Sequence, residues 1–88
     1  MEITFLDKFN KDLDKIKDKT ALKSVQHLIQ KAELANNLHD LPHVKKLEGY
    51  KSAIRIRIGD YRVGIFMKGN TIEFARIVHR KDIYRSFP

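Results

Sequence analysis

The 88-residue sequence predicts an α+β domain in which a short N-terminal strand and an antiparallel two-helix hairpin precede an antiparallel β-sheet. Two spacings of apolar side chains carry this prediction. Residues 7–35 repeat them every three or four positions, as amphipathic helices do, whereas residues 53–79 alternate them with polar ones, as half-buried strands do. No repeat, linker or low-complexity tract interrupts the chain. We therefore expect residues 1–88 to form a single domain, with the helices on one face of the sheet.

The helical half begins with a short strand at Glu2–Phe5. Asp7 is the expected N-cap of the first helix, whose apolar side is Phe9, Leu13 and Ile16. After a tight link at residues 18–20, Thr20 is the expected N-cap of the second helix. This helix has an apolar stripe and ends at Asn36 and Asn37. The stripe consists of Leu22, Val25, Leu28, Ile29, Ala32 and Ala35.

Residues 38–51 show no regular spacing, and Pro42 excludes a helix through them, so we expect a connecting loop. Its apolar residues would hold it against the core; they are Leu38, Leu41, Val44 and Leu47. Three strands are then predicted, at Ala53–Ile58, Tyr61–Met67 and Thr71–His79, joined by two-residue turns at 59–60 and 69–70.

The first predicted hairpin can be registered residue by residue. With a two-residue turn, Arg57 faces Arg62 and Arg55 faces Gly64, while the isoleucines and Val63 lie on the other side. The same count across the second turn pairs Gly64 with Ala75 and Arg62 with Ile77. Those two small residues would leave a shallow floor for a nucleotide. The count also places His79 on the arginine face and Arg76 on the core side, near an edge.

Charge is distributed unevenly along the chain. Residues 1–44 contain seven lysines and seven acidic residues, whereas residues 45–88 contain all six arginines and carry the net charge of +7. This concentration favours a polyanion or an acidic protein as partner, and arginine suits phosphate particularly well. The alternative is a basic surface that serves only solubility.

The arginine face predicts an anion-binding site. Directly opposed like charges destabilise a sheet by up to ~1 kcal/mol, and a bound phosphate would replace this repulsion with charge-assisted hydrogen bonds. The alternative is a solvated face with its arginines spread into water. Tyr84 could stack on a base, or cover part of the sheet as a half-buried residue. Four further cations are expected to contact RNA: Lys46, Lys51, Lys81 and Arg85.

Several kinds of chemistry are not supported. The chain has no cysteine, no glycine-rich phosphate loop and no pattern for a serine triad. His39 and His43 have metal-ligand spacing only on a helix, which Pro42 prevents, so neither a metal nor a cofactor is expected. No signal peptide opens the chain, and no apolar run approaches the roughly 20 residues needed to cross a bilayer. We expect a cytoplasmic protein.

Three segments resemble toxins of the RelE/ParE superfamily: Leu47-Glu48-Gly49-Tyr50, Arg55 to Val63, and Val78-His79-Arg80-Lys81-Asp82-Ile83-Tyr84. The last segment is closer to the RelE branch. The resemblance extends over nearly the whole chain and implies a RelE-like fold and a toxin held inactive by a cognate antitoxin. It also implies metal-independent cleavage of mRNA in the ribosomal A site, by attack of a ribose 2′-OH on the adjacent phosphate.

Carried over by position, the resemblance implies that Arg55, Arg57, Arg62, Arg80 and Tyr84 are catalytic. Since arginine stays protonated, it stabilises developing charge but is a poor base. Histidine is the residue type best suited to proton transfer at physiological pH, so His79 is the expected acid or base. The expected catalytic set is Arg55, Arg57, Arg62, His79, Arg80 and Tyr84. Two alternatives remain, namely a ParE-type inhibitor of DNA gyrase and a basic module that binds RNA or a partner without catalysis.

Overall fold

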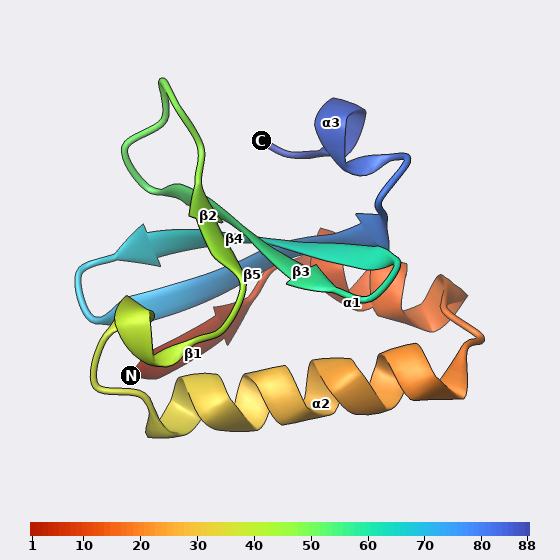
Figure 1. Ribbon diagram of the computed structural model, residues 1–88, viewed down its shortest axis with the longest axis horizontal. Coiled ribbons are helices and arrows are strands. Elements are labelled where there is room, and N and C mark those ends of the chain that lie inside the picture. Colours follow the sequence, from red (N-terminus) through yellow and green to blue (C-terminus); the bar gives the residue numbers. More distant parts are fainter.

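The computed structural model describes residues 1–88 as a five-stranded β-sheet with two helices on one face and a short third helix on the other (Figure 1). The elements are β1 (Glu2–Phe5), α1 (Asp7–Lys15), α2 (Lys19–Leu34), a 3-10 turn (Leu38–Asp40), β2 (Val44–Lys46), β3 (Ala53–Ile58), β4 (Tyr61–Lys68), β5 (Thr71–His79) and α3 (Ile83–Ser86). The predicted α+β class and order of elements are confirmed. None of the helices has the length and apolar character that crossing a membrane requires.

The sheet is mixed rather than wholly antiparallel. Its strand order is β1-β5-β4-β3-β2, and β1 lies parallel to β5 while all other neighbours are antiparallel. Parallel strands need a long crossover connection, and the chain between β1 and β5 provides one. The predicted antiparallel pairing of β3, β4 and β5 is confirmed. The place of β1 in the sheet was not predicted, because spacing within a strand does not show where that strand is inserted.

Both helix caps differ from the predicted ones. Leu6 is the N-cap of α1, and Asp7 is its first helical residue. At α2 the Asp18 side chain accepts hydrogen bonds from the backbone N–H groups of Thr20 (2.9 Å) and Ala21 (3.2 Å), so Asp18 is the N-cap instead of Thr20. A carboxylate two and three residues before free N–H groups is well placed to satisfy them.

The segment predicted as a loop contains strand β2. Val44 of β2 pairs with Ile56 of β3, and Lys45 pairs with Arg55. A strand of three residues is too short to show alternation, which explains why the spacing missed it. Helix α3, with four residues, was missed for the same reason.

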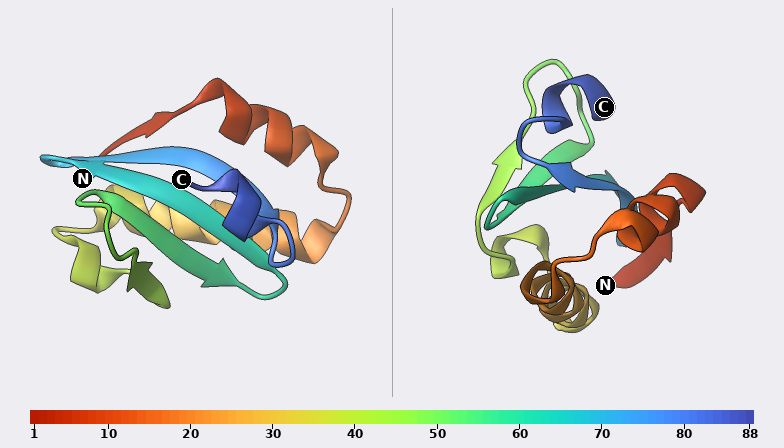
Figure 2. Two further views of the ribbon diagram at one scale, coloured as in Figure 1. Left: turned by 90° about the horizontal axis from the view of Figure 1, so that it is seen from above. Right: turned by 90° about the vertical axis from the view of Figure 1, so that its right-hand side faces the viewer.

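The main core lies between the sheet and the two long helices. Phe9 of α1 and Phe74 of β5 are fully buried, with ring centroids 5.3 Å apart. A smaller cluster lies on the other face of the sheet, where α3 packs (Figure 2). Its buried members are Ala53, Ala75, Ile83 and Phe87.

A β-bulge in β5 changes the predicted register of the second hairpin. Ladder pairs run as predicted from the turn to Ile65 and Phe74, but the next pair is Gly64 with Arg76, because β5 has one extra residue there. Two consecutive residues at a bulge oppose one residue of the partner strand, and alternation is shifted beyond them. The predicted sides of Arg76 and His79 are therefore both wrong. Arg76 shares the row of Gly64, and His79 pairs with Tyr61, which packs against the main core.

Candidate functional site

Three arginines from one hairpin lie together on the sheet face opposite α1 and α2. Arg55 and Arg57 come from β3 and Arg62 comes from β4, in the predicted register of Arg57 with Arg62 and Arg55 with Gly64. They border a hollow of about 380 Å³, within the range of small-molecule sites. We call it the arginine hollow; it is lined by His43, Val44, Lys45, Arg55, Arg57, Arg62 and Tyr84. Since none of these is acidic, its charge is positive.

The opposed pair of arginines is held apart by neutral acceptors. The Nη1 of Arg62 donates to the carbonyl oxygens of Gly59 (2.8 Å) and Tyr61 (2.9 Å) in the turn. The Nη2 of Arg57 lies 3.2 Å from the Nδ1 of His43. No carboxylate forms an ion pair with Arg55, Arg57 or Arg62. Three cations without counter-ions are thus available to an anion from outside.

Arg55 and Tyr84 form the other half of the hollow. The guanidinium carbon of Arg55 lies 4.7 Å from the ring centroid of Tyr84, in a cation–π contact. The buried Nε of Arg55 has no hydrogen-bond partner, a deficit of about 1–3 kcal/mol that a ligand oxygen could relieve. Tyr84 is 80% exposed, so it projects from the sheet surface and is not a half-buried cover.

The floor predicted at Gly64 is filled by the chain's own C-terminal segment. A Cβ at Gly64 would lie 2.4 Å from Cγ of Phe87, and the Phe87 ring also packs against Phe66 at 5.0 Å. Because Gly64 has no side chain, the Phe87 ring packs directly on it and holds α3 against the sheet. Helix α3 carries Tyr84. The hollow lies beside this contact, over the arginines.

The sequence prediction missed three residues of the hollow, the apolar Val44 and the polar His43 and Lys45. His43 has a φ of 57° and accepts a hydrogen bond from the backbone N–H of Arg57 on its carbonyl oxygen (3.2 Å). Arginine can only donate, so the Nδ1 of His43 is the acceptor and the ring hydrogen is on Nε2. Lys45 enters as the cross-strand partner of Arg55. Only the register of β2 could have revealed these residues.

Two members of the predicted catalytic set lie elsewhere. His79 packs edge-on against Tyr61 at 5.8 Å, and its Nδ1 accepts a hydrogen bond from the backbone N–H of Lys81 (3.2 Å). The Nε of Arg80 lies 4.0 Å from a carboxylate oxygen of Asp60. Neither His79 nor Arg80 lines the arginine hollow. The structure therefore groups Arg55, Arg57, Arg62 and Tyr84 and separates His79 and Arg80 from them, because of the bulge and the turn beyond β5.

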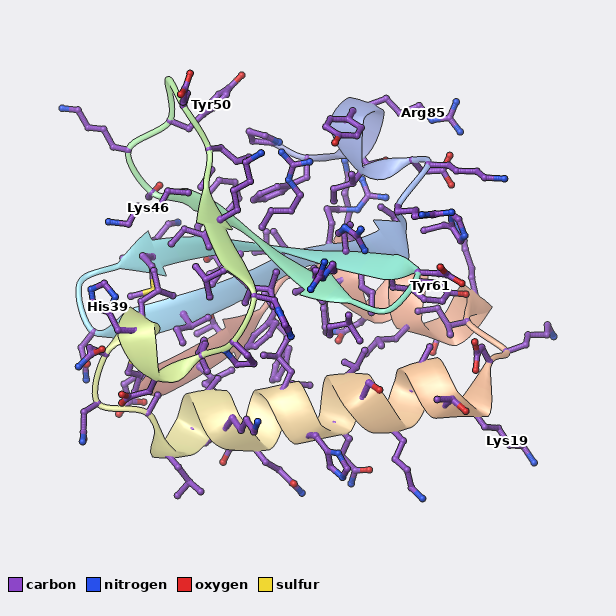
Figure 3. The ribbon with its side chains drawn as sticks, in the orientation of Figure 1. Lys19, His39, Lys46, Tyr50, Tyr61 and Arg85 are labelled. Atoms are coloured by element: carbon purple, nitrogen blue, oxygen red, sulfur yellow. The ribbon has the colours of Figure 1, made fainter.

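The four cations predicted to contact RNA are dispersed. Lys46 pairs with Ile54 and so lies on the helix-facing side of the sheet, unlike its neighbour Lys45. Lys51 is exposed in the loop before β3, and Lys81 is exposed after β5. Arg85 of α3 forms an ion pair with Asp82 and lies far from Lys46 in the labelled view (Figure 3). None of the four lines the arginine hollow.

A second charged cluster has a structural role. Asp12 of α1 is 6% exposed, and its carboxylate receives two hydrogen bonds from Arg76, at 2.8 and 3.1 Å, and one from the backbone N–H of Ile77 at 3.0 Å. This carboxylate raises the pKa of Arg76 above its ordinary value, chiefly through the hydrogen bond. The pairing of β1 with β5 ends at Phe74, so the backbone N–H of Ile77 has no partner on a neighbouring strand at this edge. The Asp12 carboxylate accepts its hydrogen bond instead. The pair thus secures α1 on β5.

Known proteins share this fold over nearly the whole chain. The chain is 40% identical to "Toxin RelE3" of Methanocaldococcus jannaschii, with all of both chains covered. It is 38% identical to a chain of the RelB-RelE antitoxin-toxin complex from Methanococcus jannaschii, with a TM-score of 0.83, covering 97% of this chain and 99% of the other. The YoeB dimer from Staphylococcus aureus shares the fold alone, at 19% identity and a TM-score of 0.72 over 91% and 97% of the two chains.

A protein-family model matches residues 3–84, and it describes the ParE toxin of the type II toxin-antitoxin system parDE. The match begins within β1 and covers the other four strands and both long helices. The chain therefore belongs to the RelE/ParE superfamily of toxins from type II toxin–antitoxin systems, and its 40% identity to Toxin RelE3 places it on the RelE-like side. The resemblance seen in the sequence is confirmed.

Proposed function

We propose that this toxin is a metal-independent endoribonuclease that cleaves mRNA in the ribosomal A site and thereby stops translation. One observation carries the proposal: Arg55, Arg57 and Arg62 line a single hollow that contains no carboxylate. A protein selected only for stability would pair such cations with acidic residues. An RNA phosphate would satisfy them with charge-assisted hydrogen bonds.

The arginines suit the charge that develops during cleavage. When the 2′-oxygen bonds to phosphorus and the bond to the 5′-oxygen breaks, negative charge accumulates on the phosphoryl oxygens. Arg57 and Arg62 stand opposite each other and can hold this phosphate from two sides. Tyr84, exposed above Arg55, can stack on a neighbouring base, a contact of about 1–3 kcal/mol in other systems.

His43 takes the proton-transfer role that the sequence had suggested for His79. It is the one histidine of the arginine hollow, and its Nδ1 lone pair faces Arg57. When Arg57 turns to the phosphate, Nδ1 becomes free to take the proton of the 2′-OH. The 5′-oxygen takes a proton from water as it leaves. The products are a 2′,3′-cyclic phosphate and a free 5′-hydroxyl, and the imidazolium returns its proton to solvent.

A cognate antitoxin is the proposed protein partner. The similar chain at 38% identity belongs to a RelB-RelE antitoxin-toxin complex, and the Escherichia coli RelBE toxin-antitoxin complex shares the fold. The surplus of +7 favours an acidic partner segment. Toxin and antitoxin would meet in the cytoplasm, where mRNA is translated.

Cell-free translation followed by mapping of mRNA 3′ ends tests the proposal. The wild-type toxin should produce defined new ends, and Arg62→Ala should lower the cleavage rate by about 10²-fold or more, since a charge-stabilising group is lost. Lys11→Ala is the control, because Lys11 is an exposed cation of α1 outside the arginine hollow and is not among the cations expected to contact RNA. Equal loss in both variants, or no cleavage by any of them, would contradict the assignment. RNA binding without cleavage would leave a non-catalytic module.

A ParE-type gyrase inhibitor is the second candidate, because the matching family model describes the ParE toxin. The same preparation can be added to a DNA supercoiling assay. Blocked supercoiling with intact mRNA would select this alternative, whereas normal supercoiling with cleaved mRNA supports the endoribonuclease.

A further inference from the structure

A second hollow adjoins the arginine hollow around the edge of the sheet. It measures about 250 Å³ and lies between α2 and the last residues of β3. His43 and Arg57 line both hollows, so the two are contiguous across that rim. On its far side the second hollow is bordered by His27 and Lys31 of α2. We call it the edge hollow.

The edge hollow exists because β2 ends its pairing early. The ladder between β2 and β3 extends only from Ile54 to Ile56, so the rest of β3 is the outermost strand. His43 precedes β2 with a positive φ and folds back so that its carbonyl oxygen accepts from the N–H of Arg57. The two side chains meet at 3.2 Å, where the surface passes from the arginine face to the helix side.

Charge distinguishes these two hollows from the other three main hollows of the surface. No aspartate or glutamate lines the arginine hollow or the edge hollow. Each of the remaining three has two carboxylates: Asp12 and Asp82, Asp14 and Glu33, or Asp18 and Asp60. The linings of these two hollows together form an acid-free surface from Arg62, over the rim, to Lys31. It ends at Ser24, Ile58 and Gly59, which the edge hollow shares with the hollow that contains Asp18 and Asp60. Such a surface matches a ligand with repeated negative charges, and not a single small anion.

We infer that the edge hollow is a second phosphate subsite, in which Lys31 and His27 hold a phosphodiester further along the same strand, beyond the two that a trinucleotide places over the arginines. The occupant is single-stranded RNA whose backbone crosses the rim formed by His43 and Arg57. The inference rests on the proposed endoribonuclease function. It defines the path of the RNA strand, which runs from the arginine hollow over the rim to α2. Ser24, which also lines the edge hollow, supplies a neutral hydroxyl donor to the same backbone.

Binding of 2′-O-methyl RNA, which lacks the attacking hydroxyl, tests the inference separately from cleavage. Fluorescence anisotropy would compare a trinucleotide with a dodecamer over a range of salt concentrations. Lys31→Ala should weaken dodecamer binding about 3–10-fold and reduce the salt slope by about 0.7, the value for one lost phosphate contact on a single strand. The trinucleotide should bind as to wild type. Lys11→Ala is the control, since Lys11 is exposed on α1, which packs at β5.

Each other outcome has a distinct meaning. If Arg62→Ala weakens both oligonucleotides while Lys31→Ala weakens neither, the subsite is refuted and the arginine site stands. If neither substitution matters, the proposed RNA function fails as well. If Lys31→Ala weakens only binding of an acidic peptide, or weakens trinucleotide and dodecamer equally, the edge hollow is not an RNA subsite.

Discussion

Replacing Gly64 by alanine probes how α3 is held above the sheet. Gly64 has no left-handed φ, so its backbone would accept any residue, and alanine should by itself favour the strand. The obstacle is Phe87, because a Cβ at position 64 would lie 2.4–2.7 Å from three atoms of its ring. Real carbon atoms do not approach this closely, so the ring must move.

The cost follows from what the ring would leave. Phe87 is 5% exposed and packs against Phe66, so a shift that keeps it partly buried should cost about 1–3 kcal/mol, as overpacking does elsewhere. Complete expulsion sets an upper limit of about 3–5 kcal/mol, the cost of truncating a buried phenylalanine. We expect Gly64→Ala to lower the free energy of unfolding by about 2 kcal/mol.

A double-mutant cycle with Phe87→Ala isolates this contact. Without the ring, Gly64→Ala should become neutral or stabilise by about 0.5–1 kcal/mol, since glycine is unfavourable inside a strand. Urea unfolding followed by circular dichroism gives all four free energies. Equal destabilisation in both backgrounds would refute the idea that Phe87 is the obstacle. If α3 positions Tyr84, the single variant should also lose RNA cleavage more than its remaining stability explains.

Four further predictions concern the ion pair and the arginine hollow. Asp12→Ala should lower the free energy of unfolding by about 3 kcal/mol, because Arg76 loses its partner in a partly buried place; a loss below about 1 kcal/mol in urea would show that water replaces the carboxylate. The pKa of Arg76 is higher in the folded protein than in the unfolded chain. The stability that its charge contributes is therefore fully present below the pKa of an unfolded arginine and is lost only as pH rises through the higher folded value. Thermal melts should show no loss of stability from this group between about pH 6 and 9. In single-turnover assays His43→Gln should slow cleavage about 10²-fold, whereas His79→Gln should change it less than about 3-fold; the reverse order would restore His79 as the proton-transfer group. Tyr84→Phe should keep most RNA affinity and Tyr84→Ala should lose about 1–3 kcal/mol of it, since the ring rather than the hydroxyl makes the contact.

The spacing of apolar residues correctly predicted the structural features that depend only on residues close together in the sequence. The register of β3 on β4 and the common face of Arg55, Arg57 and Arg62 follow from a period of two and a two-residue turn, and the structure agrees at every pair. Long amphipathic helices were equally accessible, because many residues repeat one pattern. These local rules were enough to locate the arginines.

Features that depend on distant partners were not predictable in this way. The bulge next to Ala75 moved His79 off the arginine face, and no spacing signals one extra residue between two good strands. His43 reached the hollow through a three-residue strand whose partner lies ten residues further on. Asp12 is not part of the apolar side predicted for the first helix, and it is buried because β5 extends beyond β1.

The bulge divides β5 into two stretches, and the residue numbers that point into the main core are even before the bulge and odd after it. Before it, even-numbered side chains such as Ile72 and Phe74 point into the main core, and after it the odd-numbered Ile77 does. When a residue of β5 is assigned a role by alignment with a related protein, the face of the sheet on which it lies must be counted from the bulge. Deleting the extra residue would leave Ile77 opposite Val63 and His79 opposite Tyr61. Pairing the full-length strand without a bulge would instead carry His79 to the side of the three guanidinium groups and Ile77 away from the main core.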